Sequence, residues 1–226
     1  MMIDEQLSLQ DGVMYIIGID LSGPSNTADT VLTSFRRDDS VLRLHQSIIG
    51  ASDMQILEFI TDHTSGTVAV GIDAPLSYNP GGGHRPFDSD LQRNVIAAGL
   101  HAGSVMPPTL NRMAYLTLRG ISVARMLQSI QINRPRIVEV HPGAAMALRH
   151  APIDLVRMFK RNDTARIQLL EWLEQQGLRF TSIATDPSDH YVAACAAAFV
   201  TWKWKEEKTV WLHGAEPPLH PFDFAC

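Results

Sequence analysis

Apolar residues recur along the chain with two different periods, which separate strand-like runs from helix-like runs. Residues 13–20 form a short, nearly continuous apolar run that ends in an aspartate, which is typical of a strand covered on both faces. Residues 30–36 and 41–48 are separated by four polar residues and predict a hairpin. Residues 67–73 repeat the pattern of the first run. In residues 136–141 successive side chains would point to alternate faces of a strand. We therefore expect five principal strands.

Five further segments carry helical periodicity or the signals of helix ends. Ser52 followed by Gln55 forms a capping-box pattern, and the helix that it begins should end near His63. Gly177 stands where a helix commonly terminates. We place Asp186 at the N-cap of the last, alanine-rich helix, with Pro187 as its first residue. The other three helices are expected at residues 87–100, 111–130 and 163–176.

The order of these elements predicts a single domain over residues 1–226. A right-handed crossover through the helix after Ser52 returns the chain beside its start, so the first and fourth strands become parallel neighbours. The resulting mixed α/β sheet has the strand order 3-2-1-4-5 and helices on both faces. Residues 74–135, rich in proline and glycine at their start, form a loop and helical insertion, and residues 210–212 add a short terminal strand.

The composition is that of an ordinary globular protein, with 45% hydrophobic and 19% charged residues and a mean hydropathy of -0.02. Residues 1–12 contain three acids and no basic start, unlike a secretory signal. No apolar run suits a membrane span, since residues 191–204 are interrupted by polar side chains. Two cysteines, Cys195 and Cys226, support neither a disulfide framework nor a zinc site. We therefore expect a cytoplasmic protein without a membrane partner, and its oligomeric state stays open.

Charge is distributed unevenly along the chain. The formal net charge is -5, which argues against a protein that coats nucleic acid indiscriminately. Residues 74–170, however, carry twelve Lys or Arg against five Asp or Glu. This excess permits a basic surface that would contact a nucleic acid substrate, and the alternative is a scatter of solvated arginines.

Two strands end in the same tripeptide, Gly-Ile-Asp, at residues 18–20 and 71–73. Parallel neighbours place their carboxyl ends at one edge of the sheet, so Asp20 and Asp73 should meet there, where open α/β sheets bind ligands. Two adjacent carboxylates repel unless a cation lies between them. With oxygen ligands and no Cys or His cluster, the cation predicted is Mg²⁺ or Mn²⁺, which suits hydrolysis of a phosphodiester.

Three other acids are candidates to complete this set, and each has a structural alternative. Asp189, one turn into the expected last helix, is assigned to function, although an acid there also stabilises the helix dipole. For Asp186 a capping role is the expectation. Glu139 on the fifth strand either joins the acids or pairs with an arginine, and both alternatives remain open. Asp20 and Asp73 themselves have the alternative of turn-forming aspartates, and His141 stays a secondary candidate.

Several of these segments, in their order and spacing, resemble the family called domain of unknown function 429. The members of this family are predicted ribonuclease-H-like nucleases. The resemblance rests on residues 18–20, 71–75, 85–88, 104–108 and 139–142, together with Asp189 before the alanine-rich helix. It implies a ribonuclease-H-like fold with Asp20, Asp73 and Asp189 at the acidic positions and Glu139 close by. It also implies functional roles for Arg85 and Asp88, which would lie over the acids. The sequence departs from the family pattern at His190, where alanine is common, and in residues 211–218.

The prediction is a metal-dependent nuclease in which Asp20, Asp73, Glu139 and Asp189 are catalytic and Arg85, Asp88 and Ser22 contact the substrate. Asp20, Asp73 and Asp189 would bind the metal. A nucleotide-binding ATPase or phosphotransferase of the actin-like class is the first alternative, because residues 20–25 resemble a phosphate-binding turn. The chain lacks the second half and late glycine pair of that class. A ribonuclease-H-like binding module without catalysis is the second alternative.

Overall fold

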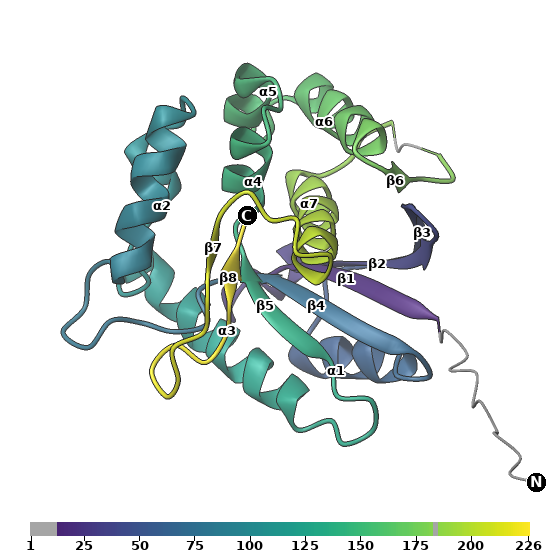
Figure 1. The fold of residues 1–226 in the computed structure, drawn as a ribbon, viewed down its shortest axis with the longest axis horizontal. Helices are drawn as coiled ribbons and strands as arrows, with labels where there is room; N and C mark the ends of the chain where they lie inside the picture. Colours follow the sequence, from purple (N-terminus) through teal and green to yellow (C-terminus); the bar gives the residue numbers. More distant parts are fainter. Residues whose placement is uncertain (1–12, 183–184) are drawn as a thin grey trace, which may run out of the picture.

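The structure, a computed structural model, describes residues 13–182 and 185–226. The prediction made for residues 1–12 therefore lies outside the described residues. Within the described ranges, one mixed sheet contains eight strands (Figure 1). Their bounds are β1 Met14–Asp20, β2 Val31–Asp38, β3 Val41–Ile49, β4 Thr67–Asp73, β5 Arg136–Val140, β6 Leu178–Arg179, β7 Leu212–His213 and β8 Phe224–Ala225.

The strand order is β6-β3-β2-β1-β4-β5-β8-β7. The predicted order 3-2-1-4-5 is correct for the five longer strands, including the antiparallel hairpin β2–β3 and the parallel pairs β1–β4 and β4–β5. It is incomplete for the sheet, because β6 extends one edge and β8 with β7 extends the other. Each of these edge strands has only two residues, which is too short for a periodic pattern.

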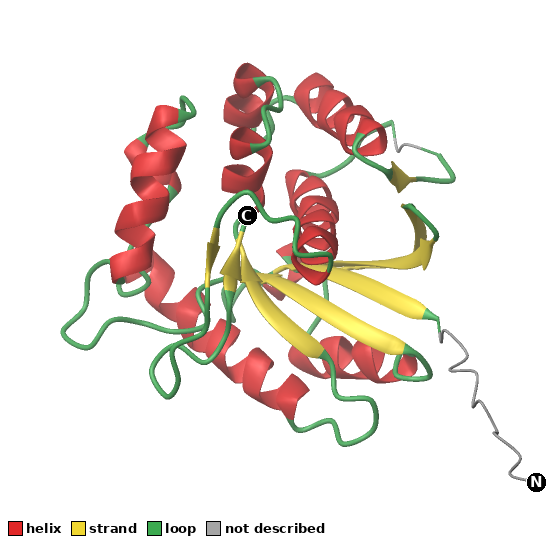
Figure 2. Cartoon of the chain, in the orientation of Figure 1, coloured by secondary structure: helices red, strands yellow, loops and turns green. Residues whose placement is uncertain are grey.

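Seven α-helices cover the sheet in the described residues. They are α1 Asp53–Asp62, α2 Pro86–Ala97, α3 Asn111–Gln128, α4 Pro142–Leu148, α5 Ile153–Met158, α6 Asp163–Gln175 and α7 Asp189–Lys205. Two hydrophobic cores lie on opposite faces: α1 and α3 pack on one, and α7 with α2, α4, α5 and α6 on the other (Figures 1 and 2). The mixed α/β fold with helices on both faces is therefore confirmed. No helix among the described residues has the length and apolar character needed to cross a membrane.

The two glycines of the repeated tripeptide allow α7 to lie directly on the centre of the sheet. Gly18 and Gly71 are register partners on β1 and β4. A Cβ on Gly18 would lie 2.0 Å from the carbonyl oxygen of Ala194, and one on Gly71 would lie 1.9 Å from Oγ1 of Thr201. Neither position has room for a side chain, so each tripeptide combines helix packing with an acid at the strand end.

The start of α7 differs from the prediction. Ser188 is the N-cap, and its hydroxyl accepts a hydrogen bond from the backbone N–H of Tyr191 at 3.0 Å. The N-cap role expected for Asp186 is therefore wrong: Asp186 is exposed and lies 4.0 Å from the guanidinium of Arg166. Asp189 is the first residue of the helix and not one turn into it. Serine and aspartate are both favoured at an N-cap, so the two candidate caps, Asp186 and Ser188, two positions apart, were equally compatible with the sequence pattern.

Other helix ends agree with the sequence. The capping box of Ser52 and Gln55 is present, and His63 is the C-cap of α1. Gly177 follows the C-cap of α6 with φ of 110°. Helices α4 and α5 were not predicted, since each is short: α4 begins at Pro142, where the preceding strand pattern ends, and α5 directly follows Pro152. The insertion at 74–135 contains α2 and α3, which lie on opposite faces of the sheet.

Candidate functional site

Asp20 and Asp73 lie side by side at the carboxyl ends of β1 and β4, where they are Cα partners in the parallel register. The pKa of Asp73 is raised well above its ordinary value, first by burial and then by the charge of Asp20. A side-chain hydrogen bond with Asp20 raises it further. The pair therefore holds a proton to a higher pH than two separate carboxylates would in water.

His190, the second residue of α7, contacts Asp20 of this pair. Its Nδ1 lies 2.6 Å from Oδ2 of Asp20, and its Nε2 lies 3.6 Å from Asp29 and 4.0 Å from Asp189. The hydrogen bond to Asp20 raises the pKa of His190, and the charges of these three acids act in the same direction. The imidazole therefore supplies positive charge to the acids, and it separates Asp189 from Asp20.

The donor chemistry of the pair fits a divalent cation such as Mg²⁺ or Mn²⁺, because both side chains offer hard oxygen ligands whose mutual repulsion a cation would relieve. Among the described residues, no group of three or more His, Cys, Asp or Glu side chains is arranged to hold a metal ion. A third ligand therefore requires a side-chain movement, and Asp189, whose carboxylate lies 4.0 Å from Nε2 of His190, is one candidate from the predicted set.

Glu139, on β5, forms an ion pair with an arginine, which is one of the two alternatives that the sequence left open. Its Oε1 lies 2.5 Å from Nη2 of Arg85, and its Oε2 accepts a hydrogen bond from Nη1 at 2.8 Å. Asp88 holds the other side of the same guanidinium, with Oδ1 at 2.7 Å from Nη2. The three side chains are almost completely buried, with Arg85 2% exposed. Arg85 and Asp88 are therefore engaged with each other and with Glu139 inside the protein.

This buried network holds the segment that follows Asp73. The backbone N–H of Leu76 donates to Oε2 of Glu139 at 2.9 Å, and Nη1 of Arg85 donates to the hydroxyl of Ser77 at 3.0 Å. His220, near the C-terminus, contacts the same hydroxyl at 2.8 Å. The insertion is thus tied to β5 and to the C-terminal segment beside the acidic pair.

Ser22, predicted to contact the substrate, lies in the loop after β1 and is engaged internally. Its hydroxyl lies 2.6 Å from the carbonyl oxygen of Asn26 and 2.7 Å from Oγ1 of Thr30. Nη1 of Arg119 donates to the carbonyl oxygen of Ser22 at 2.9 Å, and Nε of Arg119 is 2.8 Å from Asp53. This arginine from α3 therefore joins the loop after β1 to the start of α1.

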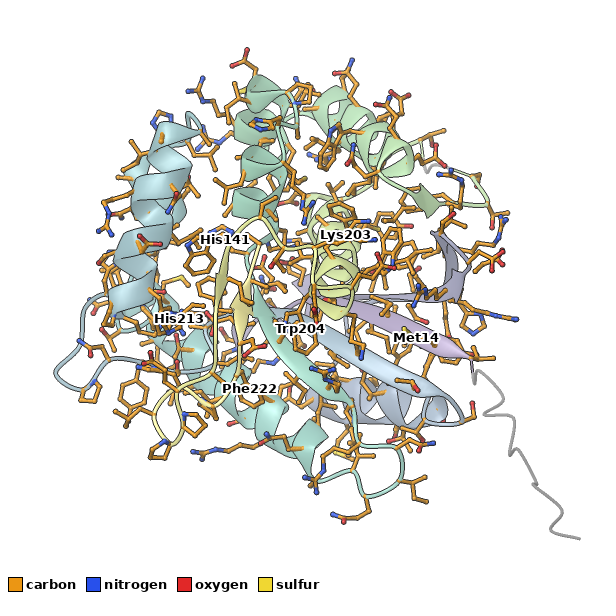
Figure 3. All side chains as sticks on the ribbon, in the orientation of Figure 1. Met14, His141, Lys203, Trp204, His213 and Phe222 are labelled. Carbon is orange, nitrogen blue, oxygen red and sulfur yellow. The ribbon has the colours of Figure 1, made fainter. Side chains whose placement is uncertain are left out.

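His141 lies at the junction of β5 and α4, where it caps the helix (Figure 3). Its Nε2–H donates to the carbonyl oxygen of Ser104 at 2.8 Å, which leaves Nδ1 to accept from the backbone N–H of Ala144 at 3.3 Å. Burial lowers the pKa of His141, and the nearby charge of Lys160 lowers it further. The side chain is a neutral structural cap.

Three of the arginines in the insertion at 74–135 are engaged in ion pairs. Arg85 and Arg119 are buried in ion pairs, and Arg93 pairs with Asp90 at 2.9 Å. Lys160, an exposed residue after α5, also acts on the acidic pair, because its charge lowers the pKa of Asp73 against the larger effects that raise it.

Sequence reasoning found Asp20, Asp73 and Asp189 and missed Asp29, Lys160 and His190 as parts of the same cluster. Asp29 lies in a 3-10 turn (residues 27–29, η1) and Lys160 in a loop, and neither carries a periodic or motif signal. His190 was visible as a departure from a family pattern, but the pattern does not indicate that its ring lies against Asp20.

These observations define a mixed α/β protein with an acidic pair at the ends of adjacent parallel strands. The family model described as Protein of unknown function (DUF429) matches residues 18–217, and the chain belongs to this family. The match spans β1 to the C-terminal segment and includes the whole acidic cluster. Searches of curated proteins and of solved structures found no match.

Proposed function

We propose that this protein is a ribonuclease-H-like, divalent-metal-dependent phosphodiester hydrolase. The observation that carries the proposal is the contact of Asp20 with Asp73, together with the raised pKa of Asp73. A fold retains such an unfavourable pair most readily where function requires it. The inner strand order and the position of the acids at the carboxyl ends of parallel strands support the ribonuclease-H-like assignment.

Each side chain has a distinct part in the proposal. Asp20 and Asp73 would hold the metal, and Asp189 would join them once His190 turns away. A bound divalent cation supplies a Lewis acid that activates water and stabilises the leaving oxygen. Glu139, Arg85 and Asp88 are positioning residues that fix the segment after β4. Lys160, exposed beside the acids, is placed to contact a phosphate of the substrate.

Of the two alternatives, the ATPase has less support. An ATPase would use the loop after β1 to bind phosphate, yet the hydroxyl of Ser22 is occupied by Asn26 and Thr30. A binding module without catalysis could use the same acids to hold a metal, and the turnover test below distinguishes it from the hydrolase.

Metal binding is tested by thermal unfolding with and without Mn²⁺ or Mg²⁺. At a metal concentration a hundredfold above Kd we expect stabilisation of about 2.7 kcal/mol, or a rise in Tm of roughly 5–10 °C, because the metal binds only the folded chain. The double variant Asp20→Asn with Asp73→Asn should lose this rise. Glu58→Gln with Asp62→Asn, which removes two exposed acids from α1, is the matched control and should retain it. Equal shifts in all three proteins would remove the metal site.

Hydrolysis is tested by incubating the protein and Mn²⁺ with single-stranded, double-stranded, hybrid and branched nucleic acids beside ATP. We expect cleavage of at least one nucleic acid and none by the double variant. Cleavage of ATP alone would favour the ATPase, and metal binding without any turnover would favour the binding module.

His190→Ala should bind Mn²⁺ more tightly than the parent protein. The imidazole engages Oδ2 of Asp20 and supplies positive charge at the acids, so a metal must displace it. Removing one competing charge-assisted hydrogen bond is worth about 1.5–3 kcal/mol, which corresponds to a gain in affinity of roughly tenfold or more. Calorimetric titration measures this directly. Weaker binding by the variant would show instead that His190 is a ligand.

A further inference from the structure

A second charged site lies at the opposite end of α7 from the acids. Lys203 is thirteen residues after His190, so it lies roughly 20 Å further along the helix axis. Here a hollow of about 470 Å³ opens between the β2–β3 turn, the end of α6 and the last turn of α7. Figure 3 shows Lys203 on α7. The hollow shares no residue with the acidic cluster.

Three cations and two acids line this hollow. Glu206 forms ion pairs with two of these cations. Its Oε1 lies 3.2 Å from Nη2 of Arg37, and its Oε2 lies 3.0 Å from Nζ of Lys208. It also accepts a hydrogen bond from Nε1 of Trp202 at 2.8 Å. Asp39 brings the second negative charge, which leaves the lining with one excess positive charge.

Lys203 carries that excess. Its Nζ lies 3.4 Å from the centre of the Trp202 ring, and no carboxylate of the described residues lies within 4.0 Å of it. Burial lowers the pKa of Lys203 to about 8, and the charges of Arg149 and Lys208 add to this against the opposing effect of Glu206. The cation is held on an aromatic face among other cations, although water or an anion would stabilise it better.

Arg149, which does not line the hollow, carries a buried donor without a partner among the described residues and lies close to Lys203. Its guanidinium lies 5.2 Å from the Phe199 ring, which Lys203 also contacts at 5.3 Å. Nη2 of Arg149 donates to the carbonyl oxygen of Lys208, whereas its buried Nε has no hydrogen-bond partner in the described part of the chain. Burial also lowers the pKa of Arg149.

We infer that this hollow binds a phosphate group, with Lys203 as its principal cation and Arg37 and Lys208 at its rim. A compact ammonium suits the spherical charge of a phosphate, and both rim cations can turn from Glu206 to the ligand. Gln176 and Ser40 offer hydrogen bonds at the same opening. The proposal is independent of the metal-dependent hydrolysis at the other end of the helix.

The test is calorimetric titration of the full chain with inorganic phosphate and, separately, with adenosine monophosphate, against chloride at matched ionic strength. Lys203→Met keeps the aliphatic stem on Trp202 and removes the charge, so the fold should be retained. We expect it to weaken phosphate binding at least tenfold. Lys205→Met, two residues along α7 and outside the lining, is the control and should change the affinity less than twofold.

Each outcome decides the proposal. Binding of phosphate that Lys203→Met alone weakens supports the site, and tighter binding of the nucleotide then identifies a phosphate monoester and not free phosphate. No binding beyond that of chloride overturns the proposal. An equal loss in the two lysine variants also overturns it, since this would reflect the overall charge of the chain.

Discussion

Arg85→Met is expected to destabilise the protein by about 3–5 kcal/mol. The guanidinium is the shared partner of Asp88 and Glu139, and all three side chains are buried. Without it, two carboxylates remain together away from water with only backbone donors, at the N–H groups of Arg85 and Leu76. Urea unfolding measures the loss. If the variant does not fold, Arg85→Lys keeps the charge and loses the forked geometry, and should show an intermediate loss.

Arg93→Met is the matched control for this prediction. Arg93 also lies on α2 and pairs with an aspartate three residues away, Asp90, at 2.9 Å. That pair is exposed, so the change in the free energy of unfolding should stay within about 1 kcal/mol. Similar losses for both variants would show that the buried network does not contribute as the contacts indicate.

The sequence was most informative where a short motif both packs against a helix and fixes the position of a site residue. The repeated Gly-Ile-Asp identified β1 and β4, their parallel pairing and the meeting of Asp20 with Asp73. The structure adds the reason for the glycines: backbone atoms of α7 and the side chain of Thr201 occupy the space of the missing Cβ atoms. The strand pattern and the strand order were enough to predict this contact, because the carboxyl ends of adjacent parallel strands lie at the same edge of the sheet.

The choice of partners could not be predicted from the sequence. Glu139 had two alternatives that depend on a side chain 54 residues away, and only the packing of α2 shows that Arg85 reaches it. The ring of His190 lies against Asp20 because α7 packs directly on Gly18 and Gly71 of the sheet, and no local sequence pattern shows this placement. Long-range contacts and the first turn of a helix therefore account for most of what the pattern missed.

The two acidic groups of the molecule consequently differ in physical character. Glu139 and Asp88 are compensated by a buried guanidinium and stabilise the fold. Asp20 and Asp73 share one edge with His190 at one side and the exposed Lys160 nearby, and the pKa of Asp73 is raised by burial and by the charge of Asp20. Stability should therefore respond in opposite directions when the two groups are neutralised.

Asp73→Asn is accordingly expected to raise the stability at neutral pH by about 0.5–2 kcal/mol, the range of substitutions that relieve a strained functional site. Because the pKa of Asp73 is raised on folding, the folded chain holds a proton that the unfolded chain releases. Stability of the parent protein then falls as the pH rises above the ordinary aspartate pKa, and it stops falling above the raised pKa of the folded state. Asparagine matches the neutral carboxyl in shape and still donates to Asp20, so the variant avoids this loss.

Urea unfolding of the parent and of Asp73→Asn between pH 3 and pH 8 checks the sign. The two stabilities should converge near pH 3, where both states of the parent are protonated, and separate as the pH rises. Asp62→Asn, an exposed acid of α1, should follow the parent at every pH to within about 0.5 kcal/mol. A variant that is less stable than the parent at pH 7 would mean that Asp73 is compensated in the folded chain. A gain in stability accompanied by loss of the Mn²⁺ response would instead show that the fold tolerates this carboxylate for the sake of a cation.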